Sequence, residues 1–319
     1  MTRHLALVGC TATGKSALAL ELARRAPDAE IVSLDSMQVY RGMDIGTAKA
    51  TAAERAAVPH HLVDVVDPEH EWSVRESQRS TAAAIAGIEA RGRRAVLVGG
   101  TGLYVRAVID GLTVPPRAPE TRRALEASTS TATGLAAGYA RLQQVDPASA
   151  ARIEPGNRRR IVRALEVFET TGLPFSSFGA GLTSYPPPVM PVDLVGVWLP
   201  RPELSRRIFR RFVAMRDRGL LDEVRTLAGR PEGLSRTARQ AIGYKELLEF
   251  LDGRIPTLDA ALELAVRRTR QFARRQRMWF RRDPRIRWLA AARNPEALAP
   301  VLLALWKAGA TAEPVADHA

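Results

Sequence analysis

The sequence is poor in the residues that form covalent crosslinks and metal clusters. It has one cysteine, Cys10, and five scattered histidines among 319 residues. A single cysteine cannot form an internal disulfide and cannot build a cysteine-based metal cluster alone. Five scattered histidines do not supply a cluster either. We therefore expect neither a disulfide framework nor a Cys/His metal cluster.

Long apolar runs are also missing. No stretch approaches the roughly 18 apolar residues that a membrane-spanning helix needs. Hydrophobic residues make up 46% and charged residues 25%, as in an ordinary soluble protein of about two domains. From Met1 the chain passes straight into a strand-like run, without a charged leader, apolar signal core and cleavage site in succession. These absences predict a soluble, cytoplasmic protein with no membrane partner.

Acidic residues are too few to balance the basic ones. The chain has 34 acidic and 47 basic residues, a formal net charge of +13 and a pI near 10.9. Such an excess favours a polyanionic partner, with nucleic acid as the leading candidate.

Short apolar runs alternate with helical patterns in the first third of the chain. The expected strands are residues 5–8, 31–34 and 95–98, and the expected helices are residues 17–25 and 74–90. This alternation is typical of βαβ units around a parallel sheet. The strands end in GCTATGKS, DSMQ and GGTGLY, and ligands bind at the carboxyl ends of such strands. The three loops therefore predict one site.

Two proline-rich segments, VPPRAP at 114–119 and SYPPPVMP at 184–191, indicate domain boundaries. Between them the helical segments are 119–128, 135–144, 147–153 and 157–171, and strand-like sequence resumes at 192–199. We expect an α/β fold: a P-loop core with a parallel sheet flanked by helices, formed by residues 1–114 and 190–319, plus an inserted all-helical domain at 115–189. The later helices are expected at 202–218, 220–227, 244–251 and 258–281, before a frayed tail at 308–319.

The segment GCTATGKS satisfies the P-loop spacing between a strand and a helix. Its glycines let backbone amides turn toward phosphate oxygens, Lys15 adds a positive charge, Ser16 can ligate Mg²⁺, and the helix dipole favours an anion. The expected diphosphate-binding residues are Gly9, Cys10, Thr11, Ala12, Thr13, Gly14, Lys15 and Ser16. Alone, the loop predicts a bound nucleotide such as ATP.

The carboxylate expected beside a P-loop stands in an unusual place. In nucleotide hydrolases a second strand usually ends in an aspartate that holds Mg²⁺, whereas residues 95–98 are followed by Gly99, Gly100 and Thr101. Asp35 follows the strand at 31–34 instead, where it can act as a metal ligand or as a base. This placement argues against a plain ATPase.

Residues 267–287 contain ten arginines and one acid, Asp283. On a helix, the spacing of three and four residues places one set on a single face, opposite Ala265, Thr269, Phe272 and Trp279. That set, named here the arginine stripe, is Arg267, Arg270, Arg274, Arg277 and Arg281. An RNA backbone would neutralise it. A second basic cluster begins a helix of the inserted block and consists of Arg158, Arg159, Arg160 and Arg163. A separate pair, Arg207 and Arg211, lies one helical turn apart, where both could reach the diphosphate.

Taken together, these motifs resemble the tRNA dimethylallyltransferases (tRNA isopentenyltransferases) of the bacterial type. The resemblance covers nearly the whole chain, through GCTATGKS, DSMQVYRGMDIGTAK at 35–49, PHHLVD at 59–64, VGGTGLY at 98–104, RRIVRALEV at 159–167, AIGYKE at 241–246 and RRQRMWFR at 274–281. The segment at 35–49 is the specific part, because P-loop proteins in general do not share it.

The resemblance implies transfer of a dimethylallyl group from dimethylallyl diphosphate to the exocyclic N6 amine of the adenosine immediately 3′ of the anticodon. Asp35 would be the general base, Thr101 would lie near the amine, and the P-loop with Mg²⁺ would hold the leaving diphosphate. The protein would act as a monomer, with the inserted block gripping the anticodon stem-loop. The residues expected at the tRNA are Asp35, Ser36, Met37, Gln38, Thr101, Arg122, Arg159, Arg160, Ile161, Val162, Arg163, Gln240, Tyr244, Lys245, Arg274, Arg275, Gln276, Arg277 and Arg281.

The sequence departs from the family pattern at Cys10 and Ala50, where proline is usual, and at Arg159, where many relatives have glutamine. The single cysteine also excludes the zinc finger of eukaryotic relatives. Two rival functions stay open at this point. One is a P-loop kinase that phosphorylates a small molecule or nucleoside with ATP, and the other is a non-catalytic RNA-binding protein that senses nucleotide. The kinase explains Lys15 and Asp35 but not the arginine stripe or the inserted basic block.

Overall fold

The computed structural model describes residues 3–178, 182, 184–291 and 294–311. Its internal contacts divide the chain into two compact units, one formed by Met1–Asp110 with Pro188–Ala319 and the other by Gly111–Pro187. The first unit contains the sheet.

Six parallel strands form a single sheet in the order β3-β2-β4-β1-β5-β6. Their bounds are β1 His4–Gly9, β2 Ala29–Ser33, β3 His60–His61, β4 Arg94–Gly99, β5 Val192–Trp198 and β6 Arg287–Ala290. Leu7 of β1 is in register with Val98 of β4 on one side and with Val195 of β5 on the other. The parallel sheet confirms the expected α/β class, and the strand order makes the carboxyl ends of β2, β4 and β1 neighbours.

Alternate residues of the buried strands pack on opposite faces of the sheet, as the two-residue period of a strand requires. Leu5 and Leu7 pack with α1 (Lys15–Arg25) and α14 (Ala299–Thr311). Ala6 and Val8 share a second core with α3 (Val74–Ala90) and α4 (Gly102–Ile109). Each core strand is therefore covered on both sides, which explains its continuous apolar sequence.

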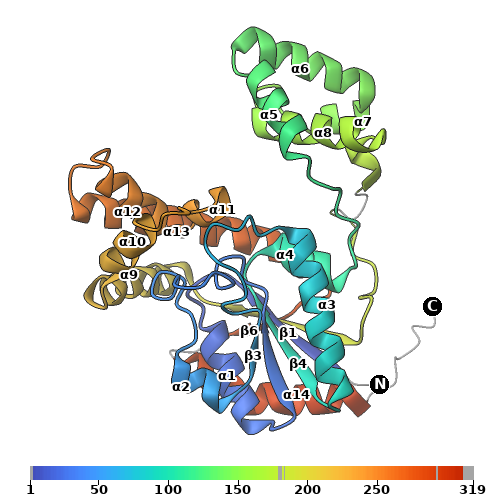
Figure 1. Ribbon diagram of the computed structural model, residues 1–319. Coiled ribbons are helices and arrows are strands. Elements are labelled where there is room, and N and C mark those ends of the chain that lie inside the picture. The colour runs from blue at the N-terminus through green and yellow to red at the C-terminus, as the bar shows by residue number, and fades with distance from the viewer. Residues whose placement is uncertain (1–2, 179–181, 183, 292–293, 312–319) are drawn as a thin grey trace. The chain divides into compact units, whose positions relative to one another are not determined.

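A group of helices extends the first core beyond the sheet. It comprises α9 Arg201–Asp217, α10 Leu220–Ala228, α11 Arg236–Arg239, α12 Tyr244–Leu251 and α13 Leu258–Phe280. In Figure 1 these helices, coloured gold to orange, gather apart from α1, α3 and α14, which lie along the sheet. The longest, α13, contacts α9, α12 and β1, so it connects this group to the sheet.

The second unit is a small helical bundle with its own core. Its helices are α5 Pro119–Ser128, α6 Ala132–Val145, α7 Pro147–Ala150 and α8 Arg158–Thr171, followed by the 3₁₀ turn Phe175–Phe178. Leu142, Ile161 and Leu165 are buried together. Asp146 accepts hydrogen bonds from the backbone N–H groups of Ser149 and Ser176, and thereby ties α7 to the 3₁₀ turn.

Several boundaries differ from the sequence-based expectations. The helix expected at 147–153 is confined to α7. Six of the described helices and strands were not expected: α2 Ala52–Ala57, β3, α4, α11, β6 and α14. The frayed tail was expected from residue 308, but α14 continues to Thr311, and residues 312–319 lie outside the described residues. Within the described part of the chain, no helix is both long and apolar enough to cross a membrane.

Candidate active site

The P-loop turns sharply between β1 and α1. Gly9 has φ 140° and Gly14, the residue before α1, has φ 93°, both in a region that favours glycine. A Cβ on Gly9 would lie 2.4 Å from the carbonyl oxygen of Val197 in β5. Glycine is therefore required at Gly9 for two reasons, its backbone conformation and the close approach of β5.

Lys15 points back into the loop that precedes it. Its Nζ donates a 2.5 Å hydrogen bond to the carbonyl oxygen of Cys10, which also accepts a bond from the hydroxyl of Thr13. Burial lowers the pKa of Lys15 to about 8, and the nearby Asp35 carboxylate opposes that shift. The loop thus holds a desolvated ammonium at the N-terminus of α1, where the helix dipole also attracts an anion.

Gln276 of α13 joins two of the three loops. Its Oε1 accepts a 2.8 Å bond from the N–H of Thr11, and its Nε2 donates a 2.7 Å bond to the carbonyl oxygen of Gly100. A Cβ on Gly100 would lie 2.7 Å from Nε2, so glycine leaves the space that the amide fills. Both ends of this buried amide are bonded inside the protein, and the expected contact of Gln276 with tRNA stays a prediction.

Asp35 follows β2 and is half-buried. Its Oδ1 accepts a 2.8 Å bond from the N–H of Met37, and its own N–H donates to the hydroxyl of Ser33. These bonds fix the carboxyl group in a tight turn, and Oδ2 forms no hydrogen bond within the described residues. The carboxylate acts electrostatically on both Lys15 and Arg211, so it lies close to the phosphate loop.

Thr101 follows β4, between the ends of β1 and β2. It occupies the position before α4, but its side chain forms no capping hydrogen bond there. The hydroxyl of Thr101 therefore does not cap α4. A Cβ on the next residue, Gly102, would lie 2.1 Å from the ring of Trp279, so α13 also packs closely against this loop.

The two arginines expected at the diphosphate differ in their surroundings. Arg211 of α9 donates a 3.3 Å bond to the hydroxyl of Thr11. Burial lowers the pKa of Arg211, and the Asp35 carboxylate opposes this shift. Arg207 instead pairs with Glu203 on its own helix at 3.3 Å. Arg211 therefore belongs to the candidate site, whereas Arg207 forms an ion pair with Glu203 on α9.

The arginine stripe forms the outward face of α13, as its spacing predicts. Ala265, Thr269 and Phe280 are buried on the opposite side. Arg277 is half-buried, with its guanidinium 5.8 Å from the ring centroid of Trp198, while the other four are exposed. Arg267 pairs with Glu263 at 3.8 Å, but within the described residues Arg270, Arg274, Arg277 and Arg281 have no acidic partner. Their charges are available to an external anion.

Other residues expected at the tRNA are divided by their exposure. The exposed ones are Arg159, Arg160, Gln240 and Arg275, and the half-buried ones are Ser36, Met37 and Lys245. Nζ of Lys245 donates a 3.4 Å hydrogen bond to Oε1 of Gln240. Ile161 and Val162 lie in the core of the helical unit and Tyr244 in that of the sheet unit. These three side chains are buried, and their expected place at the tRNA stays a prediction.

Arg122 and Arg163 are engaged within the helical unit. Arg163 donates to the carbonyl oxygens of Pro115 and Pro116 and pairs with the buried Glu166 at 3.0 Å. Arg122 pairs with Glu126 at 2.9 Å and lies 3.6 Å from Glu166. Both arginines therefore stabilise the unit itself, and binding a phosphate would require them to share or release these partners.

Comparisons with known proteins agree with one another. A family model described as IPP transferase matches residues 38–283, and one described as isopentenyl transferase matches residues 2–61. The chain is 51% identical to a tRNA dimethylallyltransferase of Roseiflexus castenholzii over 290 residues, covering 90% of this chain and 92% of that one. It is 46% identical to the Bifidobacterium longum tRNA dimethylallyltransferase over 298 residues, covering 92% and 88% of the two chains.

Solved structures give the same result. The crystal structure of the tRNA isopentenylpyrophosphate transferase from Bacillus halodurans has a TM-score of 0.68 and 37% identity, covering 98% of this chain and 99% of that one. A eukaryotic dimethylallyltransferase captured acting on tRNA has a TM-score of 0.73 and 27% identity, covering 91% of this chain and 74% of that one. Sequence, fold and the three converging loops lead to one conclusion: the chain belongs to the tRNA dimethylallyltransferase (IPP transferase) family.

Proposed function

We propose that this protein transfers the dimethylallyl group of dimethylallyl diphosphate to the N6 amine of the adenosine immediately 3′ of the anticodon in tRNA. The observation that carries the proposal is the meeting of Asp35 with Lys15 and Arg211 at the ends of neighbouring parallel strands. One carboxylate beside two cations suits a reaction that releases a diphosphate and takes a proton from an amine.

The cations bind and stabilise the leaving group. Lys15 and Arg211 contact neighbouring residues of the P-loop, Cys10 and Thr11, beside the amides at the start of α1, so together they attract the diphosphate. Negative charge on that diphosphate grows as its bond to the allylic carbon breaks. Because these donors are held in place by Cys10 and Thr11, they need little rearrangement to stabilise the growing charge.

Asp35 acts as the base for the adenine amine. An exocyclic adenine amine is a weak nucleophile, so a base must accept its proton as the nitrogen–carbon bond forms. Oδ1 is held by the Met37 amide, which leaves Oδ2 for the proton. The new bond joins N6 to the allylic carbon, the carbon–oxygen bond to the diphosphate breaks with its electron pair, and one proton passes to Asp35.

A magnesium ion fits the donors present. Mg²⁺ usually keeps several waters and takes one or two protein ligands together with phosphate oxygens. Ser16, at the second position of α1, offers a hydroxyl beside the diphosphate site. Within the described residues no group of three or more His, Cys, Asp or Glu side chains forms a metal cage, which suits an ion held mainly by substrate. When bound, Mg²⁺ would neutralise charge on the diphosphate.

The tRNA would lie on the arginine stripe, with the Gly111–Pro187 unit binding the anticodon stem-loop through Arg159 and Arg160. A stacked adenine cannot reach Asp35, so the base must leave the stack, which costs a few kcal/mol in a loop. We propose that the protein acts as a monomer in the cytoplasm. The kinase alternative is not favoured, because the curated relatives are tRNA dimethylallyltransferases.

A comparison of donors tests the proposal. The protein is incubated with dimethylallyl diphosphate and unmodified tRNA, and separately with ATP and small acceptors. Prenyl transfer to tRNA in the first mixture, with no phosphoryl transfer in the second, is the expected result. Transfer from ATP alone would establish the kinase instead.

Replacing Arg274 and Arg277 together by alanine is expected to weaken tRNA binding and flatten its salt dependence. Each lost phosphate contact should reduce the slope of log K against log salt by roughly one unit. Binding is measured at several salt concentrations. The matched control replaces Arg24 and Arg25 by alanine and removes the same number of charges. Both lie in the last turn of α1, at the end of the helix that is distant from the P-loop. Equal slopes for both variants would show that the stripe does not bind RNA.

Affinity for inorganic pyrophosphate is expected to fall between pH 7 and about 9.5. The pKa of Lys15 is lowered to about 8, so its ammonium is charged below that pH and attracts the anion, while above it the attraction is lost. Calorimetry measures affinity and proton uptake at each pH, and the Lys15→Met variant separates this effect from titration of pyrophosphate itself. A wild-type profile parallel to that of the variant would rule out Lys15 as the titrating group.

A further inference from the structure

The orientation of Gln38 depends on a segment that follows it. The Oε1 of Gln38 accepts a 2.9 Å bond from the hydroxyl of Ser33, and its Nε2 donates a 3.2 Å bond to the carbonyl oxygen of Thr47. Ser33 also binds the N–H of Asp35. The side chain of Gln38, which is expected at the tRNA, and the turn that carries Asp35 are therefore both connected to residues 44–47.

One carboxylate from a distant helix holds this segment. Oε2 of Glu223, in α10, accepts bonds of 3.0 Å and 2.7 Å from the N–H groups of Asp44 and Ile45. Its Oε1 accepts a 3.2 Å bond from the N–H of Gly46. Three successive backbone amides thus donate to one side chain, and Glu223 lies 179 residues after Asp44 in the sequence.

Tyr244 of α12 supports the same carboxylate. Its hydroxyl donates to Oε1 of Glu223. Burial raises the pKa of Tyr244, and the adjacent Glu223 charge raises it further, so the hydroxyl stays protonated and keeps donating. A Cβ on Gly46 would lie 2.3 Å from the Tyr244 ring, so the segment also packs tightly on this side chain.

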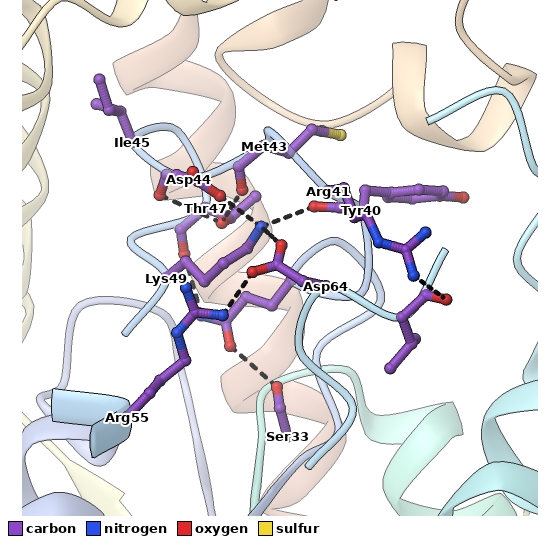
Figure 2. Close-up of polar contacts among 12 residues, drawn as sticks. Ser33, Tyr40, Arg41, Met43, Asp44, Ile45, Thr47, Lys49, Arg55 and Asp64 are labelled. Carbon is purple, nitrogen blue, oxygen red and sulfur yellow. Dashed lines mark hydrogen bonds and ion pairs between the residues drawn. The ribbon is translucent and has the colours of Figure 1, made fainter. Parts of the chain in front are cut away.

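Lys49 closes the other end of the segment, as Figure 2 shows. Its buried Nζ donates to the carbonyl oxygen of Tyr40 at 2.7 Å and to the carboxylates of Asp44 at 2.6 Å and Asp64 at 2.5 Å. Arg55 binds the second oxygen of Asp64 at 2.6 Å. Lys49 therefore binds the segment to neighbouring loop residues, whereas Glu223 binds its backbone to α10, outside the sheet.

We propose that Glu223 is a positioning residue for tRNA recognition: it holds residues 44–46, and through the Thr47 carbonyl it orients Gln38 toward the adenine. The inference rests on the proposed function, since it concerns the base that receives the dimethylallyl group. Glu223 touches no substrate in this account. The P-loop has a separate support in Gln276, so Glu223 acts on the tRNA side of the reaction and not on the diphosphate side.

Steady-state kinetics of three variants tests the inference. Glu223→Ala leaves three amides without an acceptor and should raise KM for tRNA about tenfold to 100-fold, since each unsatisfied group carries a cost. KM for dimethylallyl diphosphate should change less than about threefold. Glu223→Gln keeps one carbonyl acceptor for Asp44 and Ile45, and Tyr244 can donate elsewhere or accept, so this variant should recover much of the tRNA affinity.

Asp222→Asn is the matched control. Asp222 is the neighbouring carboxylate on α10, exposed and paired with Arg225 at 2.8 Å, and its removal should leave both KM values unchanged. Hydrogen exchange at the amides of residues 44–46 should quicken in Glu223→Ala while β1 and α1 stay protected. This local readout separates loss of positioning from general unfolding.

Two results would overturn the inference. One is a Glu223→Ala protein with wild-type KM for tRNA, and the other is an equal rise in both KM values together with faster exchange in β1. If the alanine variant does not fold, Glu223→Asp replaces it, because its side chain is one methylene shorter and cannot reach all three amides. An unchanged KM for tRNA and unchanged exchange at residues 44–46 in that variant contradict the inference. A wild-type protein that modifies no tRNA would instead refute the proposed function, and the exchange measurement would still report on the contact itself.

Discussion

Dimethylallyl transfer is expected to fall at least about 100-fold when Asp35 is replaced by alanine or asparagine, with tRNA binding nearly unchanged. Asparagine is the sharper change, because its side-chain oxygen can still accept the bond from the Met37 amide and preserve the turn. What it cannot do is accept the proton of the amine. The rate constant of transfer, kcat, should therefore fall, and it is measured under single-turnover conditions.

Binding provides the control for this first prediction. The dissociation constant of tRNA is measured for Asp35→Asn and wild type at the same salt concentration, because affinity for nucleic acid depends strongly on salt. A variant with normal transfer would rule out Asp35 as the base. A variant that loses binding as much as transfer would give Asp35 a structural role in the loop.

Replacing Lys15 by methionine is expected to lower kcat about 100- to 1,000-fold, the scale of losing one preorganised donor to a developing negative charge. Methionine has a similar length but no charge, so it removes the bond to Cys10 and the attraction for the diphosphate. The rate of transfer is measured with saturating dimethylallyl diphosphate.

Lys307→Met is a suitable control for the second prediction. Lys307 is exposed on α14 and acts electrostatically on Asp28, next to the start of β2, and so belongs to the opposite end of the strands from the P-loop. Its loss removes one positive charge without touching the site. Equal rates for the two variants would mean that Lys15 does not stabilise the leaving group.

The sequence predicted the core of the fold because its signals are local. The P-loop lies in eight successive residues, and the helices α3, α5 and α12 begin and end where their periodicity does. The elements that it did not predict have weak local patterns. The strand β3 has only two residues, and β6 is paired only with β5 at the edge of the sheet. Such strands form because a neighbouring strand is already in place.

The candidate site was predicted only in part for a related reason. Asp35, Lys15 and Thr101 follow strands β2, β1 and β4, so their place at one edge of the sheet could be expected from the sequence. The roles of Gln276 and Glu223 depend on contacts across 265 and 179 residues, which no spacing reveals. The signal that was available for Gln276 is the inward position it takes on α13 when the arginine stripe faces outward.

Charge patterns likewise do not show whether an arginine already has a partner. Arg163 and Arg274 are both members of basic clusters, yet Arg163 binds Glu166 and two backbone carbonyls, while Arg274 is exposed. Only the folded arrangement separates an arginine that stabilises the protein from one that can bind RNA.

The most direct test of the account is mass analysis of unmodified tRNA after incubation with the purified protein, Mg²⁺ and dimethylallyl diphosphate. We expect one added dimethylallyl group, mapped to N6 of the adenosine immediately 3′ of the anticodon, and no such group with Asp35→Asn. Unmodified tRNA after incubation with the wild-type protein, or a dimethylallyl group on another nucleotide, would contradict it.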